Sequence, residues 1–171
     1  MNELDLIRRQ LATERRRAAE VAQACARAAH DLWETDELRQ ARVEYLVFVL
    51  SRFEERDQIL ADLYRARLGD AQDRRRLEAL MHGPGASREV LVKLEAALAA
   101  NGAADAPDRW RQFAEDFDGP WRARRDAVDA LLEKNPRITD WRAVSIVDAD
   151  SIVEERALYA RAQSAGSRLI P

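Results

Sequence analysis

The sequence predicts an all-α fold, an up-down four-helix bundle with a broken third helix and an extra C-terminal helix. Two observations carry this prediction. Ala, Leu, Glu and Arg are abundant, whereas Gly and Pro number only 6 and 5 among 171 residues. Straight side chains and Ala lose little rotamer freedom in a helix. Apolar residues also recur every three or four positions, which is typical of helices with one buried face.

The length of the chain favours a single helical domain that spans residues 1–171. Within it we expect a bundle over residues 1–134 and a helical appendage over residues 140–164. Hydrophobic residues make up 47% of the chain, enough to form a core and too many for a disordered protein.

The first helix is expected over residues 2–32, with Asn2 as its N-cap. Its buried face is interrupted by Glu14. The apolar positions of that face are Leu4, Ile7, Leu11, Ala18, Val21, Cys25, Ala28 and Leu32.

The second helix is expected to begin after the N-cap Thr35 and to end near Leu68, before Gly69. Asp57 interrupts its apolar face. Residues 45–50 are apolar on every side, so this stretch needs complete cover, and a second copy of the chain is one candidate to provide it. The apolar positions of the face are Leu46, Leu50, Phe53, Leu60 and Tyr64.

The third helix is expected in two pieces, because residues 83–85 read Gly-Pro-Gly. Asp70 or Asp73 starts the first piece and Ser87 caps the second. The fourth helix is expected from Pro107 to about residue 134, with a kink or break at residues 119–120, where the sequence reads Gly-Pro. A last helix is expected over residues 150–163.

Charged residues on these apolar faces are the main candidates for a functional site. They come from three helices: Glu14, Asp57, and Arg124 or Arg125. Because a lone buried charge is costly, we predict a partly buried ion-pair cluster, centred on Asp57 and an arginine of the fourth helix. The alternative is that the helical phase differs by one position and these side chains are solvated.

Motifs for catalysis or metal binding are weak. The chain has only two histidines, and neither has a second histidine at ligand spacing. Glu78 and His82 share a helix face, which fits a role at the helix end better than a metal site. Cys25 fits a small core residue, and Asp148 and Asp150 fit helix caps. We therefore expect no catalytic residues, no metal ligands and no cofactor.

The formal net charge of −3 gives no general attraction to nucleic acid or to an anionic membrane. The two arginine triplets, at residues 15–17 and 74–76, have acidic neighbours and are expected to be solvated. The longest apolar run, residues 45–50, is too short to span a bilayer. The first residues are acidic and lack the features of a signal peptide, so we expect a cytoplasmic protein. Cys25 is the only cysteine, so no internal disulfide is possible.

The second helix contains the sequence Arg52-Phe53-Glu54-Glu55-Arg56, followed by Leu60. This resembles the second helix of hemerythrin-like (HHE cation-binding) bundles, in which His-Phe, Glu-Glu and a later Leu are typical. Arg125 and Asp129 resemble the later His-x-x-x-Asp element of that family. The resemblance covers residues 1–134 and implies a four-helix bundle.

The histidine ligands of that family are missing, since the matching positions are Arg52, Arg56 and Arg125. Arginine has no lone pair to offer a metal. Only Asp129 is a ligand-competent residue at a matching position. The resemblance therefore implies a relative that has lost its metal site, with charge pairing in its place.

These observations favour a non-catalytic helical module that binds a protein partner or a small ligand. A homodimer is one form that such binding could take. Trp110, Trp121 and Trp141, with Arg122 and Arg142, are candidates for an interface, although core packing and contacts between the fourth and the last helix are the favoured explanation. The alternative function is a metal- or carboxylate-dependent enzyme or sensor with a pocket in the bundle core. Its carboxylates would be Glu14, Glu44, Glu54 and Asp57.

Overall fold

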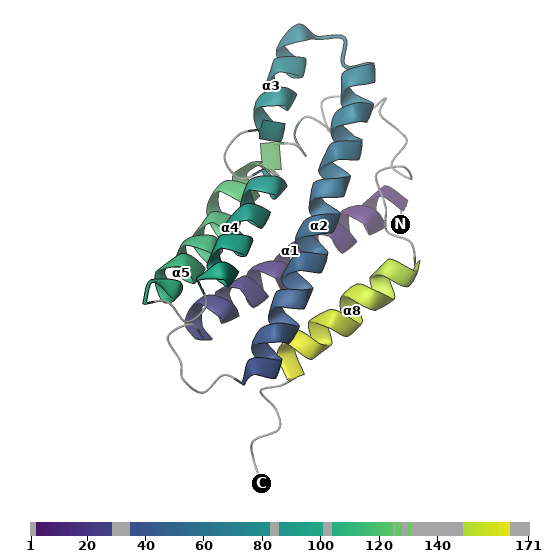
Figure 1. The fold of residues 1–171 in the computed structure, drawn as a ribbon. Helices are drawn as coiled ribbons and strands as arrows, with labels where there is room; N and C mark the ends of the chain where they lie inside the picture. The colour runs from purple at the N-terminus through teal and green to yellow at the C-terminus, as the bar shows by residue number, and fades with distance from the viewer. Residues whose placement is uncertain are drawn as a thin grey trace.

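The structure is a computed structural model, and it describes residues 3–28, 35–82, 86–100, 104–124, 126–127, 130 and 149–164. In these ranges it is all-helical, as predicted from the sequence (Figure 1). Its elements are α1 (Glu3–Ala28), α2 (Asp36–Arg67), α3 (Ala71–His82), α4 (Ser87–Ala99), α5 (Ala106–Asp116), η1 (Phe117–Trp121) and α8 (Ala149–Ser164).

The beginnings of α2 and α3 follow from local capping. The backbone N–H of Leu38 donates to Thr35 Oγ1 at 3.3 Å, so Thr35 is the N-cap of α2, as predicted. Asp70 Oδ1 accepts a hydrogen bond from the backbone N–H of Gln72 at 2.7 Å and plays the same part for α3. These side chains satisfy amide groups that have no partner within the helix.

The predicted N-cap at Ser87 is wrong. Ala86 is the N-cap of α4 and makes no side-chain capping bond, and Ser87 is the first residue of the helix. The Ser87 hydroxyl is buried and donates instead to the carboxylate of Asp57. A contact with a distant helix has therefore replaced the local one.

Both predicted interruptions are present. The third helix is divided into α3 and α4, although residues 83–85 themselves lie outside the described ranges. In the fourth helix, regular α-helix ends at Asp116 and a π-helical turn, η1, contains Pro120. Proline has no N–H to donate, so an ordinary α-helical ladder is broken at this point. Helical backbone resumes at residues 122–124.

The helices pack around one apolar cluster. α2 contacts α1, α4 and α8, and α5 contacts α1 and α4. α1 and α2 contribute Val21, Cys25, Tyr45, Leu46 and Leu50 to this cluster, so the prediction of Cys25 as a core residue is confirmed. α3 packs against α2 and lies at one end of the molecule (Figure 1).

The C-terminal helix α8, expected as an appendage, packs closely against the other helices. It packs along α2 and also contacts α1, and Ala162 is part of the central apolar cluster. In the apolar stretch of α2, Tyr45, Leu46, Val49 and Leu50 are buried, and only Val47 is clearly exposed. The cover that this stretch requires thus comes from within the chain.

Among the described residues, no helix is long and apolar enough to cross a membrane.

Candidate functional site

Glu14 lies at the centre of a buried network between α1 and α2. Its side chain is 1% exposed and that of Arg56 is 2% exposed. Arg56 Nη1 donates to Glu14 Oε2 at 2.8 Å, and Gln10 Nε2 donates to Glu14 Oε1 at 3.1 Å. The carboxylate thus receives donors from its own helix and from α2, which offsets the cost of removing it from water.

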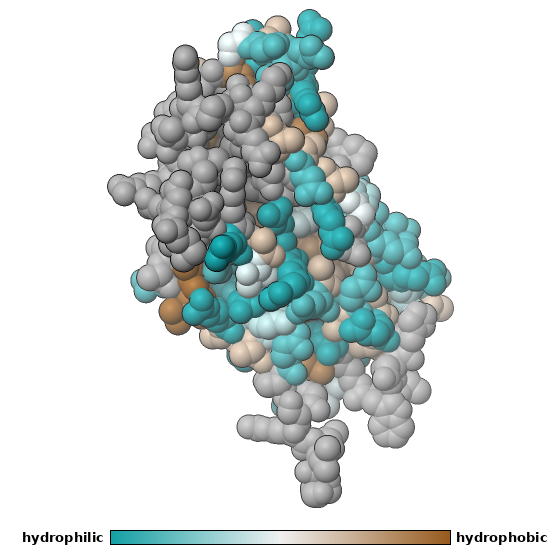
Figure 2. Space-filling model, turned by 180° about the vertical axis from the view of Figure 1, so that it is seen from behind, coloured by the Kyte–Doolittle hydropathy of each residue, from teal (hydrophilic) through white to brown (hydrophobic). Residues whose placement is uncertain are grey.

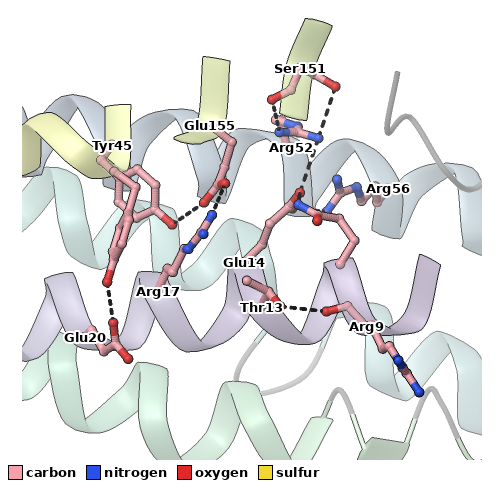
Figure 3. Close-up of polar contacts among 12 residues, drawn as sticks. Arg9, Thr13, Glu14, Arg17, Glu20, Tyr45, Arg52, Arg56, Ser151 and Glu155 are labelled. Carbon is pink, nitrogen blue, oxygen red and sulfur yellow. Dashed lines mark hydrogen bonds and ion pairs between the residues drawn. The ribbon is translucent and has the colours of Figure 1, made fainter. Parts of the chain in front are cut away.

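Arg52 connects the same network to α8. Its Nη2 lies 3.7 Å from Glu14 Oε1, while its Nη1 donates to the Ser151 carbonyl oxygen at 3.2 Å. Nη2 also donates to Ser151 Oγ at 3.3 Å. Figure 3 shows Arg52 and Arg56 on either side of the Glu14 carboxylate, with Ser151 beyond Arg52. Glu14, Arg52 and Arg56 therefore tie α1, α2 and α8 together.

Asp57 and Arg124 form a second buried pair. Arg124 Nη1 lies 2.8 Å from Asp57 Oδ2, and the two side chains are 2% and 5% exposed. Asp57 Oδ2 also accepts a hydrogen bond from Ser87 Oγ at 2.7 Å, and Trp121 Nε1 donates to Ser87 Oγ at 3.3 Å.

The predicted pairing of Asp57 with an arginine of the fourth helix is thus confirmed, and it involves Arg124. Arg125 lies outside the residues whose side chains are described. Glu14 is buried as well, but it is paired with Arg56 of α2. The alternative, that Glu14, Asp57 and Arg124 are solvated, is wrong, because all three are buried.

Arg124 also stabilises the end of α3. Its Nε donates to the Leu80 carbonyl oxygen and its Nη2 to Met81 Sδ. Carbonyl groups in the last turn of a helix lack partners within the helix and carry partial negative charge. A guanidinium at this position satisfies one of them and also neutralises Asp57.

Glu155 is the most deeply buried carboxylate among the described residues, with 0% exposure. Arg17 Nη1 donates to Glu155 Oε2 at 2.6 Å, and Tyr45 Oη donates to Glu155 Oε1 at 2.9 Å (Figure 3). Burial, together with the adjacent Glu155 carboxylate, raises the pKa of Tyr45 far above its usual value. Tyr45 is therefore a donor at every physiological pH.

Tyr159 stands beside this network on α8. Its hydroxyl donates to Glu20 Oε2 at 2.5 Å, and its ring lies under the Arg17 guanidinium, 4.8 Å from its carbon to the ring centroid. Burial and the hydrogen bond to Glu20 raise the pKa of Tyr159. The contacts of Arg17, Glu155 and Tyr159 hold α8 on α1.

Sequence reasoning missed Ser87 and Glu155, and it named Arg52 and Arg56 only through the family resemblance. A signal was present for three of them. Residues 45, 49, 52 and 56 repeat at four, three and four, so Arg52 and Arg56 continue a buried face of α2. Glu155 likewise shares a face with Leu158, Tyr159 and Ala162. Arg17, expected to be solvated with the rest of its triplet, is only 21% exposed because it pairs with Glu155.

The carboxylates proposed for a metal- or acid-dependent pocket do not gather in one place. Glu44 pairs with Arg161 at 2.8 Å, and Glu54 lies 3.7 Å from Arg88. In the described part of the chain, no group of three or more His, Cys, Asp or Glu side chains is placed to hold a metal ion. Glu78 lies near His82 and also forms an ion pair with Arg65 at 2.6 Å.

A groove runs along the outer side of α1. Its cavity volume is about 860 Å³. The α1 residues that line it recur at three and four positions from Ala12 to Arg27, so they form one stripe of the helix. One wall comes from η1 and the helical residues after it, including Trp121 and Arg122, and the other includes Tyr159 and Gln163 of α8.

The groove is rich in arginine. Among the described residues, its lining contains five arginines and two carboxylates, Glu20 and Asp126. The arginines are Arg15, Arg16, Arg27, Arg42 and Arg122. Glu20 is already engaged by Tyr159 and by Arg16 at 3.7 Å.

The tryptophans proposed for an interface belong to the core where they are described. Trp110 and Trp121 are buried, and Trp121 stacks on Phe117 with ring centroids 4.7 Å apart. Trp141 and Arg142 lie outside the described residues. Arg122 is exposed and lines the groove.

Comparisons with known proteins add no identification, because no family model, no curated protein and no solved structure matches this chain.

Proposed function

We propose that this chain is a non-catalytic helical module that binds a protein partner or a small ligand. We also propose that its four-helix part has an up-down, hemerythrin-like arrangement from which the metal site has been lost. The observation that carries the binding role is the groove of about 860 Å³ along α1. This volume lies within the range of about 300–1,000 Å³ that is common for ligand sites.

The chemistry of the bundle centre supports a role other than metal binding. Arg52 and Arg56 stand at positions that correspond, in the resemblance, to histidine ligands, and both are buried. Their guanidinium groups are directed to Glu14 and Ser151. A guanidinium cannot ligate a cation, so these two positions cannot supply metal ligands.

The alternative function, a metal-dependent enzyme or sensor, makes a different prediction. Protein purified without chelators should contain no stoichiometric iron, manganese or zinc if the binding role is correct. Elemental analysis by inductively coupled plasma mass spectrometry measures this directly. One equivalent of any of these metals per chain would contradict the non-metal proposal.

The binding role can be tested by blocking the groove. Gln23 lines it near the middle of the α1 stripe, so Gln23→Trp should fill it. Gln58→Trp is the matched control, because Gln58 is exposed on α2 and is not part of the lining. The measurement is a thermal-shift screen with a defined panel of small molecules and synthetic peptides.

A groove ligand should raise the melting temperature of the wild type and of Gln58→Trp, but not that of Gln23→Trp, since a ligand stabilises the state to which it binds. Ligands that stabilise all three proteins equally would place the site elsewhere. A panel without any ligand that distinguishes the variants would contradict the proposed role of the groove.

A further inference from the structure

We infer that the surface beneath α8 is a docking site for a helix of a partner protein, and that α8 occupies this site in the free chain. The polar groups that α8 meets there are Arg17 and Glu20 of α1 with Tyr45 and Arg52 of α2, which we call the helix-docking face. This face adjoins the groove at Glu20 but lies under α8. It is therefore a second site, beyond the proposed function of the groove.

The contacts of α8 with this face follow a regular spacing. Ser151, Glu155 and Tyr159 recur at every fourth position, so they share one side of the helix over about 12 Å. Ser151 accepts hydrogen bonds from Arg52, Glu155 accepts them from α1 and α2, and Tyr159 donates to α1. Figure 3 shows Ser151 and Glu155 directed toward these partners. The face thus recognises a helix with a hydroxyl, a carboxylate and a tyrosine at four-residue intervals.

The charges of the face also fix the direction of its occupant. On α1, Arg17 pairs with Glu155, and Glu20 accepts the hydroxyl of Tyr159. The ring of Tyr159 lies 4.8 Å from the Arg17 guanidinium carbon and 5.5 Å from the ring of Tyr45, measured to ring centroids. A helix docked in the opposite direction would bring its carboxylate toward Glu20, where like charges repel. A partner helix must therefore run in the direction of α8.

The way in which α8 is docked makes it exchangeable. Between residues 150 and 163, Glu155 and Ala162 are the only buried side chains, while Leu158 and Tyr159 are partly buried against the core. The shorter helix α4 buries four apolar side chains. Elements with few buried apolar contacts open at low free energy. When α8 leaves, water can solvate the polar groups of the helix-docking face, which lowers the cost of vacating it.

A helix from another protein is a better occupant than α8 of a second copy. The chain's own α8 is tethered and therefore binds at a high effective concentration. A second copy offers the same contacts without this advantage. An occupant that displaces α8 must make additional contacts, which a different sequence can supply and an identical one cannot.

The opposite side of the molecule offers little to a partner that docks through a broad apolar surface. Figure 2 shows the molecule from behind the view of Figure 1. Hydrophilic residues prevail among the coloured atoms, and strongly hydrophobic ones form only small separate spots. Exchange of a helix on the helix-docking face needs no such surface.

The experiment uses the full chain and a fluorescein-labelled peptide of residues 149–164, the sequence of α8. Ala157 is exposed in the interior of α8, so Ala157→Pro should break this helix and leave the helix-docking face unchanged. Fluorescence anisotropy should show that Ala157→Pro binds the peptide at least about tenfold more tightly than the wild type, because its own α8 competes less. Glu155→Ala loosens α8 by another route and should shift the affinity in the same direction.

Matched controls test position and sequence. Asp150→Pro places the same residue in the first turn of α8, where proline is tolerated, and should bind the peptide within about twofold of the wild type. Two further peptides carry Gln in place of Glu155 or of its exposed neighbour Glu154, so their net charges are equal. The first should bind Ala157→Pro about tenfold more weakly than the α8 peptide and the second should bind almost unchanged.

Failure of the α8 peptide to bind both Ala157→Pro and Glu155→Ala, with circular dichroism showing that the other helices remain, would overturn the inference. Equal losses for the two Gln peptides would also overturn it, because binding would then reflect charge alone. A wild-type dimer that Ala157→Pro abolishes in sedimentation would replace the partner helix by α8 of a second copy. If the peptide fails while a groove ligand is blocked by Gln23→Trp, the inference falls and the proposed groove function stands. The reverse pattern supports the inference and removes the groove.

Discussion

Three buried carboxylates, Glu14, Asp57 and Glu155, each lie against an arginine from a different helix. Removing one member of such a pair leaves the other charged and buried, which is far more costly than losing a surface ion pair. Each pair also fixes how two helices meet. Glu14 joins α1 to α2, Asp57 joins α2 to the residues after η1, and Glu155 joins α8 to α1. The ion pairs thus fix the relative positions of the helices within a mainly apolar core.

Replacement of Asp57 by alanine should lower the free energy of unfolding by about 3–5 kcal/mol, because Arg124 would remain buried without its counter-charge. Ser87 would lose its acceptor as well. The measurement is urea denaturation followed by circular dichroism.

Asp62→Ala is the matched control, because Asp62 lies on the same helix, is 63% exposed on its side chain, and contacts the exposed residues Arg65 and Gln58. It should cost less than about 1 kcal/mol. A loss below about 1 kcal/mol in Asp57→Ala would show that Arg124 finds water or another partner, and would refute a structural role for the pair.

Tyr45 should make stability depend on alkaline pH. Burial and Glu155 raise its pKa in the folded protein, whereas in the unfolded chain the pKa is about 10. Below pH 10 the tyrosine is neutral in both states and the stability is fully present. Above pH 10 only the unfolded form loses its proton, so the free energy of unfolding should fall by ~1.4 kcal/mol per pH unit from this group.

Tyr45→Phe should remove this part of the slope, while costing about 1–2 kcal/mol at neutral pH through the lost bond to Glu155. Denaturation curves between pH 8 and about pH 11 measure both effects. An unchanged slope in Tyr45→Phe would mean that other groups carry the alkaline dependence. Tyr159, whose pKa is raised by burial and by Glu20, is the next candidate.

At the scale of elements, Glu155 makes two of the polar contacts that hold α8 on α1 and α2. Glu155 receives both Arg17 and Tyr45, while its neighbour Glu154 is exposed. Glu155→Ala should therefore loosen α8 more than it loosens the remaining helices. Hydrogen exchange measured by mass spectrometry should show at least ~tenfold faster exchange over residues 149–164, which corresponds to ~1.4 kcal/mol of local opening free energy.

Glu154→Ala is the control and should leave exchange in α8 nearly unchanged. Exchange in α4, which is not part of the Glu155 network, should be similar in both variants. Equal acceleration in α4 and α8 after Glu155→Ala would show global destabilisation instead of local release of the C-terminal helix.

Helices and their interruptions could be predicted from the sequence because their signals are local. Thr35 and Asp70 cap the helices that follow them, and Pro120 breaks a regular ladder wherever it lies. Ser87 shows the limit of this reasoning. Its hydroxyl could form a hydrogen bond either with a local backbone amide or with a buried carboxylate of another helix. Only the packing of α4 on α2 determines which bond forms.

The candidate site was predictable only in part, for the same reason. Asp57 and Glu14 stood out because they interrupt apolar faces, but the partner of Glu14 depends on the relative rotation of α1 and α2. Burial of Glu155 depends on the docking of α8. The groove could not be foreseen, because it forms only where α1, η1 and α8, which are far apart in the sequence, meet in the fold.

At the scale of the whole molecule, the distribution of exposed apolar residues indicates whether the chain associates with itself. The sequence leaves a second copy of the chain as one candidate to cover residues 45–50, yet α8 packs along this part of α2. The large hydrophobic side chains exposed among the described residues are Val47, Val92 and Val153, on three different helices. Single exposed apolar residues are normal on monomers, whereas stable homodimers bury a total of about 1,600 Å² or more.

We therefore predict that the chain sediments as a monomer in analytical ultracentrifugation at tens of micromolar, with a mass that does not change with concentration. The reason is that α8 satisfies the apolar face of α2, and a dimer would have to displace it or use polar surface. Val47→Lys tests the one exposed position within the apolar stretch and should leave both mass and stability nearly unaltered. A concentration-dependent dimer in the wild type that Val47→Lys abolishes would show the opposite, with this face of α2 shared between two copies and α8 an incomplete cover.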